Sequence, residues 1–303
     1  MEASDASDKT RPPIWRRLLR AGFLYLGIPY LAVILIFTTF QRFLIYPGQF
    51  GSGEKESTVT TAAEDIHRVT VTTTEGLTLH GWLVAADGSS VDTSEKVLAD
   101  NRPVVLYFPG NAGDRFDREL DVRDVARLGF HVMIFDYRGY ADNKGSPSEE
   151  AFIRDAHAIW KKVTIDWNVD PQRIMLFGES LGGAVAIALA ADVSGAGQPP
   201  AKLVLNSTFS SLRDVVAQEY PYFPFHYLLW DDFNSTERIK HVQCPIIISH
   251  GMNDDIVPFD LARKLFAAAP AQSRLGIKSQ FVEIAGSGHN DIPAEKLKDL
   301  FAE

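Results

Sequence analysis

Ser180 lies between two glycines, in the sequence Gly178-Glu179-Ser180-Leu181-Gly182. An apolar segment precedes it at 174–177, and a run of small and apolar residues follows at 183–191. A G-x-S-x-G sequence that joins a buried strand to a helix is typical of a nucleophilic serine, because glycines leave room for the strained turn and the helix N-terminus favours developing negative charge. The pattern predicts a reactive serine; a polar residue in a tight turn is the alternative.

A serine hydroxyl is a weak nucleophile, so it needs a base and an acid that orients the base. Asp254 and Asp255 follow the apolar segment 245–251, and His289 follows the last apolar segment, 279–285. Each lies where the carboxyl end of a strand delivers a loop to the same edge of a sheet. The side chains of neighbouring residues diverge, so only one of the two aspartates faces His289.

Two backbone N–H groups are needed to hold the oxyanion that forms when a nucleophile attacks a carbonyl. One is expected from Leu181, the residue after the serine, and the other from Asn111 or Ala112 in a glycine-rich loop. Gly110 and Gly113 allow this loop to turn toward a substrate. An ordinary turn is the alternative interpretation of these residues.

Apolar strand candidates alternate with helical stretches through the rest of the chain. Strands that are buried on both faces and alternate with helices indicate an α/β fold, with a mostly parallel sheet covered by helices on both sides. Two β-rich stretches that come first, 66–74 and 77–86, predict an antiparallel hairpin. The strand candidates are at 103–108, 131–137, 173–178, 202–207, 245–251 and 279–285, and the helical stretches are at 115–128, 149–167, 181–193, 259–269 and 292–302.

The segment 208–243 interrupts this alternation and is rich in aromatic residues. It lies between two strand candidates, at the edge where ligands bind outside the carboxyl ends of parallel strands. We therefore expect a small cap that forms the wall of an apolar substrate pocket; a cap that only closes a core of its own is the alternative. The candidate pocket residues are Tyr222, Phe223, Phe225, Tyr227 and Trp230.

The segment 21–40 carries no charge, and a helix of its length spans about 30 Å, the thickness of the hydrocarbon core of a bilayer. We interpret it as an uncleaved transmembrane helix; a cleaved signal peptide and a buried core helix are the alternatives. The positive-inside rule then predicts a cytoplasmic tail at 1–20, a juxtamembrane connector at 41–60 and a catalytic domain at 61–303 on the periplasmic, luminal or extracellular side. The arginines that decide the orientation are Arg11, Arg16, Arg17 and Arg20, against Arg42 and Lys55 after the segment.

The composition excludes several classes of partner and cofactor. A net charge of -9 argues against nucleic acid as a partner, because phosphate binding needs a basic face. The single cysteine, Cys244, permits no intrachain disulfide, and it is expected to be a buried, inert thiol. The eight histidines show no metal-ligand spacing, and no phosphate-binding glycine motif is present. We expect neither a metal nor a cofactor.

Residues from about 66 to 302 resemble an α/β-hydrolase. They are most similar to the membrane-anchored, single-span branch that is related to the serine-aminopeptidase-like and α/β-hydrolase-domain proteins. The matching motifs are YFPGNAGD (107–114), FDYRGYADNKGSPSEE (135–150), LFGESLGG (176–183), NSTFSSL (206–212), HGMNDDIVPFDLARKLF (250–266) and GSGHND (286–291). Two departures concern the region around the oxyanion loop: Pro109 stands where the family usually has histidine, and 141–145 read ADNKG where it usually has G-x-S-x-G.

The resemblance implies Ser180, Asp254 and His289 as a catalytic triad, because the family pattern H-G-x-x-D-x-x-V-P selects Asp254 over Asp255. It further implies a membrane-anchored serine hydrolase that cleaves carboxylic esters through an acyl-enzyme, with thioesters and lipid-like acyl groups as further substrates. A serine peptidase or amidase is the alternative enzyme. A non-catalytic binding protein at the membrane is the alternative from another class, and the presence of all three triad residues favours the enzyme.

Overall fold

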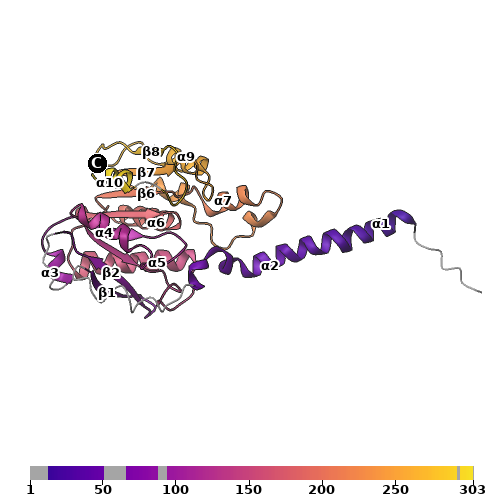
Figure 1. Cartoon of the computed structure of the whole chain (residues 1–303), viewed down its shortest axis with the longest axis horizontal. Coiled ribbons are helices and arrows are strands. Elements are labelled where there is room, and N and C mark those ends of the chain that lie inside the picture. Colours follow the sequence, from indigo (N-terminus) through magenta and orange to yellow (C-terminus); the bar gives the residue numbers. More distant parts are fainter. Residues whose placement is uncertain (1–12, 51–65, 88–93, 292–293, 303) are drawn as a thin grey trace, which may run out of the picture.

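A computed structural model describes residues 13–50, 66–87, 94–291 and 294–302 of the chain. Within these residues, strands β1 to β8 form one sheet in the order β1-β2-β4-β3-β5-β6-β7-β8 (Figure 1). The first two strands form an antiparallel hairpin, β2 pairs antiparallel with β4, and the remaining pairs are parallel. The predicted hairpin and the mostly parallel sheet are therefore confirmed. The strands are β1 (Ile66–Thr72), β2 (Thr78–Val84), β3 (Val104–Phe108), β4 (His131–Phe135), β5 (Ile174–Glu179), β6 (Lys202–Asn206), β7 (Ile246–Gly251) and β8 (Gln280–Ile284).

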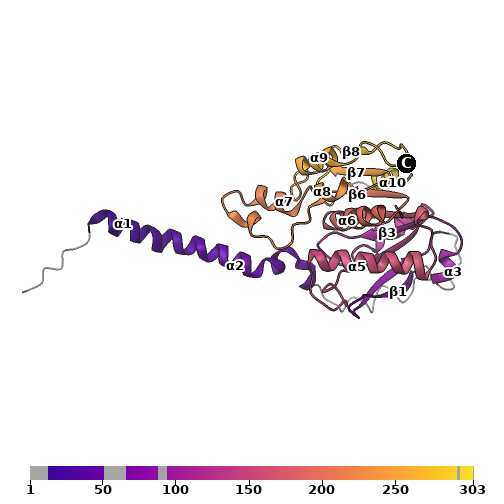
Figure 2. The same cartoon turned by 180° about the vertical axis from the view of Figure 1, so that it is seen from behind.

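Side chains of the central strands alternate between two apolar layers, because successive residues of a strand point to opposite faces of a sheet. In β3, Leu106 belongs to the larger layer and Tyr107 to the smaller one. Helices α5 (Glu149–Lys161), α6 (Leu181–Gly195) and α9 (Phe259–Ala268) pack on the larger layer (Figure 2). Helices α4 (Glu119–Arg127) and α10 (Ala294–Ala302) cover the other face. Both faces of the sheet are thus covered, as predicted.

The N-terminal helix is longer than the segment predicted to span a membrane. Helix α1 (Ile14–Gly22), one wider helical turn (Phe23–Gly27) and α2 (Ile28–Ile45) form one continuous helix of 32 residues, with a mean hydropathy of 2.1 in its most apolar window. It extends away from the sheet (Figure 2) and is long and apolar enough to cross a membrane. The predicted connector therefore begins as helix up to Ile45, and its part at 51–60 lies outside the described residues.

The cap at 208–243 packs against this helix. It contains α7 (Leu212–Glu219), a short 3₁₀ turn (Pro224–Tyr227) and α8 (Ser235–Ile239), and in both views it projects from the sheet toward α2 (Figures 1 and 2). The ring of Phe225 stacks on that of Phe37, with 3.9 Å between their centroids, and Phe223 stacks on Tyr30 at 5.2 Å. The aromatic residues of the cap thus find their partners on the N-terminal helix, a contact between segments far apart in the sequence. The structure also contains α3 (Ser94–Leu98), the 3₁₀ turns Pro47–Phe50 and Pro171–Arg173, and a wider helical turn at Lys162–Asp166.

Candidate active site

The backbone turns sharply at Ser180, between the end of β5 and the start of α6. Ser180 has φ 51° and ψ -118°, a positive φ that costs free energy for a residue with a Cβ. A Cβ on Gly182 would lie 2.0 Å from the carbonyl oxygen of Phe108, and one on Gly178 would lie 2.6 Å from that of Gly182. Both positions therefore require glycine, and the turn lifts Ser180 to the carboxyl edge of the sheet, as the G-x-S-x-G sequence predicts.

Three side chains from different loops meet at this edge. His289 Nε2 lies 3.1 Å from Ser180 Oγ, and His289 Nδ1 lies 2.7 Å from Asp254 Oδ2. A neutral imidazole in this position donates from Nδ1 to the carboxylate and accepts at Nε2 from the hydroxyl. The structure thus brings together the three residues predicted from the sequence, in the order nucleophile, base and acid. Asp255 is exposed and lies outside this relay.

Asp254 is buried and held as a carboxylate. Burial raises the pKa of its carboxyl, but hydrogen bonds from His250, His289 and the backbone N–H of Val257 outweigh it and hold the pKa well below its usual range. Oδ1 accepts from the N–H groups of Ile256 at 3.0 Å and of Val257 at 2.7 Å, so the loop is closed around the carboxylate.

His250 is a residue of the site that the sequence analysis did not single out. It is fully buried, and its Nε2 lies 2.9 Å from the carbonyl oxygen of Val257 and 3.1 Å from Asp254 Oδ2. An N–H at Nε2 therefore donates to both acceptors. It connects the end of β7 to the loop 252–258 that carries Asp254, called the acid loop below. Its place four residues before Asp254, at the end of an apolar strand, is the signal that the sequence offered.

The glycine-rich loop after β3 approaches Ser180 from one side. A Cβ on Gly110 would lie 3.6 Å from that of Ser180. The Asn111 side chain is fixed: its amide donates to the carbonyl oxygen of Ile45, and its Oδ1 accepts from Tyr140 Oη at 2.7 Å. Asn111 is half-buried beside Ser180 and Leu181, whereas Ala112 is exposed. The role of these backbone N–H groups as an oxyanion hole stays a prediction.

A cavity of about 450 Å³ opens in front of Ser180. One wall comes from α2, the opposite wall from α7 and its flanks, and the base from the nucleophile turn and the acid loop. Apart from Asn111 and Ser180, its polar lining consists of Glu219, Tyr220 and Asp255. The apolar lining residues are Phe37, Leu44, Ile45, Leu181, Phe209, Leu212, Val215, Val216, Ile256 and Val257.

The aromatic residues predicted to line the pocket lie elsewhere. None of Tyr222, Phe223, Phe225, Tyr227 and Trp230 is among the residues that line the cavity in front of Ser180. Phe223 and Phe225 pack on α2, and the other three are largely exposed. The physical reason is that α2 offers the aromatic rings an apolar partner, while smaller aliphatic residues of α7 face the nucleophile.

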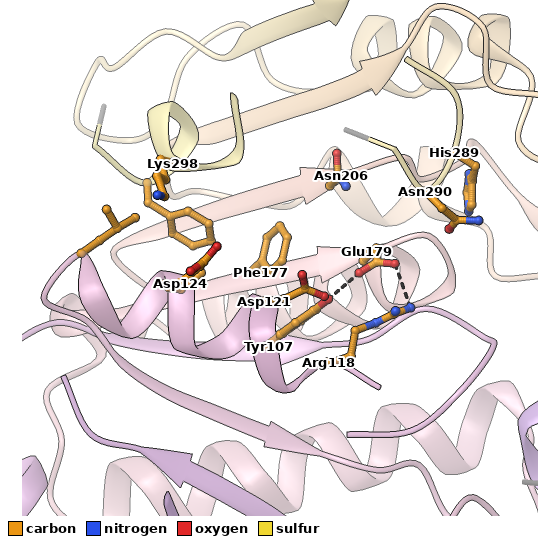
Figure 3. A pocket seen from close by; sticks show the side chains of 13 residues that line it. Tyr107, Arg118, Asp121, Asp124, Phe177, Glu179, Asn206, His289, Asn290 and Lys298 are labelled. Carbon is orange, nitrogen blue, oxygen red and sulfur yellow. Dashed lines mark hydrogen bonds and ion pairs between the residues drawn. The ribbon is translucent and has the colours of Figure 1, made fainter. Parts of the chain in front are cut away.

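A second cavity, of about 180 Å³, lies behind His289, between the sheet and the helices α4 and α10 (Figure 3). Glu179, the residue before the nucleophile, lies there between two donors: Arg118 Nη2 at 3.1 Å and the hydroxyl of Tyr107 (Figure 3). Burial and the charge of Glu179 raise the pKa of the Tyr107 phenol well above its usual value, so it stays a neutral donor. These bonds fix the side chain of Glu179, the residue that precedes Ser180 in the turn.

No group of three or more histidine, cysteine, aspartate or glutamate side chains is arranged to hold a metal ion in the described part of the chain. Cys244 is buried, and burial raises the pKa of its thiol to about 12, so it is a protonated, unreactive group at neutral pH.

Comparisons with known proteins show the family and the fold of this chain. Residues 100–226 match the family model of the serine aminopeptidase, S33. An uncharacterised protein of Mycobacterium tuberculosis is 41% identical, over 86% of this chain and 84% of its own length. The lysophosphatidylserine lipase ABHD12 of Macaca fascicularis is 32% identical, over 96% of this chain and 79% of its own length. An α/β-hydrolase of Vibrio vulnificus, solved as a crystal structure, has a TM-score of 0.62 at 20% identity and covers 78% of this chain and 79% of its own, which confirms the predicted fold.

Proposed function

Because this chain belongs to the serine aminopeptidase S33 family of α/β-hydrolases, we propose that it is a membrane-anchored serine hydrolase that cleaves carboxylic esters with lipid-like acyl groups. The observation that carries the proposal is the hydrogen-bonded relay from Asp254 through His289 to Ser180, at the base of an apolar cavity. A non-catalytic binding protein has no need for a strained serine aligned with a histidine and a buried carboxylate.

In the proposed reaction, His289 Nε2 takes the proton of Ser180 as Oγ attacks the ester carbonyl. The carboxylate of Asp254 holds the imidazole in the required tautomer and stabilises the imidazolium that forms. The backbone N–H groups of Leu181 and Asn111 hold the oxyanion; Asn111 is favoured over Ala112 because it lines the cavity. The alcohol leaves with the proton from His289, and water then releases the acid from the acyl-enzyme by the same steps.

Lipid-like esters are proposed as the substrate class on two grounds. The cavity in front of Ser180 is lined mainly by aliphatic and aromatic side chains, which favour an acyl chain over a polar peptide. The macaque relative, which this chain matches over most of its length, is a lysophosphatidylserine lipase. A thioester with the same acyl chain would fit the same site, because the relay acts on the carbonyl and the leaving group alone.

We also propose an orientation in the membrane. Arg16, Arg17 and Arg20 precede the uncharged part of the N-terminal helix, whereas Arg42 follows it. Basic residues flanking a span are retained in the cytoplasm. The N-terminus is therefore assigned to the cytoplasm and the catalytic domain to the opposite side.

The test of the enzyme is covalent labelling. A fluorophosphonate probe should label the detergent-solubilised protein at Ser180, and Ser180→Ala should abolish labelling and lower kcat for a long-chain ester by on the order of 10⁴ or more. Ser146→Ala, at an exposed serine outside the site, is the matched control and should keep full activity. Undiminished hydrolysis by Ser180→Ala would disprove the proposed mechanism.

A further inference from the structure

One wall of the cavity in front of Ser180 belongs to the helix that is long and apolar enough to cross a membrane. Phe37, Leu44 and Ile45 of α2 line this wall, and Leu212, Val215 and Val216 face them from the cap. The end of α2 also touches the oxyanion loop, because the carbonyl oxygen of Ile45 accepts from the Asn111 side chain. The helix is therefore part of the candidate active site as well as an anchor.

The charges of the helix indicate its depth in a bilayer. The uncharged run between Arg20 and Arg42 is about 32 Å long at 1.5 Å per residue, which matches a hydrocarbon core of about 30 Å. Arg42 then marks the boundary of the hydrocarbon on the side of the catalytic domain. Phe37 lies about 7 Å deeper along the helix than Arg42, and Tyr30 about 18 Å deeper. Whatever packs beside Phe37 and Tyr30 lies within the hydrocarbon layer.

The tip of the cap, residues 222–230, packs at this depth. Phe225 stacks on Phe37 and Phe223 on Tyr30. The tip also exposes large aromatic side chains, with Tyr222 87% and Tyr227 73% exposed. Large exposed apolar surfaces mark sites of contact with a membrane or with another protein. Trp230 lies where tryptophan is enriched, at the membrane interface, since its ring lies 5.5 Å from the guanidinium of Arg42, at the boundary.

Three backbone groups of the cap tip are paired with side chains of α2, which lowers the cost of placing these groups in lipid. Tyr30 Oη donates to the carbonyl oxygen of Tyr222 at 3.1 Å. Gln41 Nε2 donates to that of Leu228 at 3.1 Å, and Gln41 Oε1 accepts from the N–H of Trp230 at 2.8 Å. A polar residue within an apolar helix is costly in lipid unless it has such partners. The hydrogen bonds of Gln41 and Tyr30 with the cap thus lower the free-energy cost of placing these polar groups in lipid.

We propose that the tip of the cap is immersed in the bilayer beside α2, and that the acyl chain of a lipid ester enters the cavity from the hydrocarbon layer between α2 and α7. The chain lies against Phe37, Leu44 and Ile45 while its ester reaches Ser180. The wall extends about 12 Å along α2, from the depth of Phe37 to Ile45 beside the oxyanion loop. A long acyl chain therefore need not leave the hydrocarbon before its ester is cleaved. This inference rests on the proposed hydrolase function for the identity of the occupant, but the immersion of the cap does not.

The first arm of the test measures immersion without turnover. In full-length protein in phosphatidylcholine nanodiscs, which leave both faces of the membrane accessible, Tyr222→Cys should react with a water-soluble maleimide at least tenfold more slowly than Leu120→Cys. Leu120 is 76% exposed on α4, remote from α2, and is the matched control. Cys244 is buried and contributes little background. Equal labelling rates of the two variants would contradict the proposal that the tip of the cap is immersed in the bilayer.

The second arm tests the wall. Leu44→Trp should fill part of the cavity and lower kcat/KM at least tenfold more for a hexadecanoyl ester than for a butanoyl ester. Leu35→Trp, on the same helix but outside the cavity lining, should leave both rates unchanged. Equal losses on the two esters, or the same loss with Leu35→Trp, would overturn the acyl-chain assignment. Absence of turnover by the unchanged protein would instead contradict the proposed function. The labelling experiment would still show whether the tip of the cap lies in the bilayer.

Discussion

At the scale of single residues, the site depends on how the carboxylate of Asp254 is held. Two backbone N–H groups and two histidines surround it, and they favour its charged form in spite of burial. The adjacent Asp255 has the same chemistry but lies exposed at the cavity. The difference between the two aspartates therefore comes from the direction in which the loop presents each side chain.

We expect Asp254→Asn to be nearly inactive while remaining folded. An amide at this position selects the wrong tautomer of His289, which can cost about 10⁴ in kcat. Because hydrogen bonds keep the pKa of Asp254 below its usual range, its carboxylate is charged throughout pH 5 to 8, and protonation of Asp254 should not change the activity of the unaltered protein in that range. Asp255→Asn is the control and should keep most activity. If purified, folded Asp255→Asn were the more impaired variant, the assignment of the acid would be reversed.

His250 is expected to act as a positioning residue through Asp254. His250→Phe removes the donor to Asp254 and Val257 and should lower kcat about tenfold with little change in KM, because the acid loop loses one of the bonds that aim the carboxylate. His250→Gln, which can donate a similar hydrogen bond, should recover part of the loss. A rise in KM with kcat unchanged, or no difference between the two variants, would contradict this role. Steady-state kinetics on a butanoyl ester separates these results.

At the scale of elements, Asp231 joins the N-terminal helix to the catalytic domain. The buried carboxylate accepts from Arg42 Nε at 3.0 Å, from Tyr46 Oη at 2.9 Å and from the backbone N–H of Glu149 at 3.2 Å. The bonds thus link the end of α2 and the first residue of α5 to the cap. Because the same end of α2 contacts Asn111, the position of the helix and that of the oxyanion loop are connected.

Asp231→Ala should therefore destabilise this junction. It leaves the buried Tyr46 hydroxyl without its acceptor, which costs about 1–3 kcal/mol and lowers Tm by several degrees in a protein of this size. Activity on long-chain esters should fall with it, since the α2 wall of the cavity loosens. Asp232→Ala is the matched control: its carboxylate pairs with the half-exposed Arg213 and should change Tm little. Thermal unfolding of the two variants in detergent checks the ranking, and a larger effect of Asp232→Ala would refute it.

At the scale of the whole molecule, the proposed immersion makes the bilayer a structural partner of the catalytic domain. The N-terminal helix extends away from the sheet (Figures 1 and 2), and its end lines the same cavity as Ser180, so the proposal places the catalytic edge toward the membrane. Under the proposed immersion, lipid esters reach the cavity by diffusion along the bilayer.

The proposed orientation of the whole chain rests on its arginines. A protease added to intact cells or spheroplasts should digest the catalytic domain, because the positive-inside rule keeps Arg16, Arg17 and Arg20 in the cytoplasm. Replacing these three residues by Glu should make the domain less accessible to the protease, while Arg123→Glu, on α4, should not. Complete protection of the domain in intact cells, with cleavage only after lysis, would reverse the orientation.

The sequence alone determined the parts of this protein that depend on short-range sterics and on the order of strands. The glycines around Ser180 reveal the tight turn, because no larger residue fits there, and the alternation of apolar strands and helices predicts the sheet that brings Asp254 and His289 to the same edge. Tertiary structure alone decided which side chains surround these residues. The contact of Phe37 with Phe225, the bonds of Arg42 to Asp231 and the role of His250 join residues whose proximity no local pattern reports. Aromatic residues of the cap could serve a pocket or a packing surface equally well by composition, and the apolar face of α2 was the partner that determined where they lie.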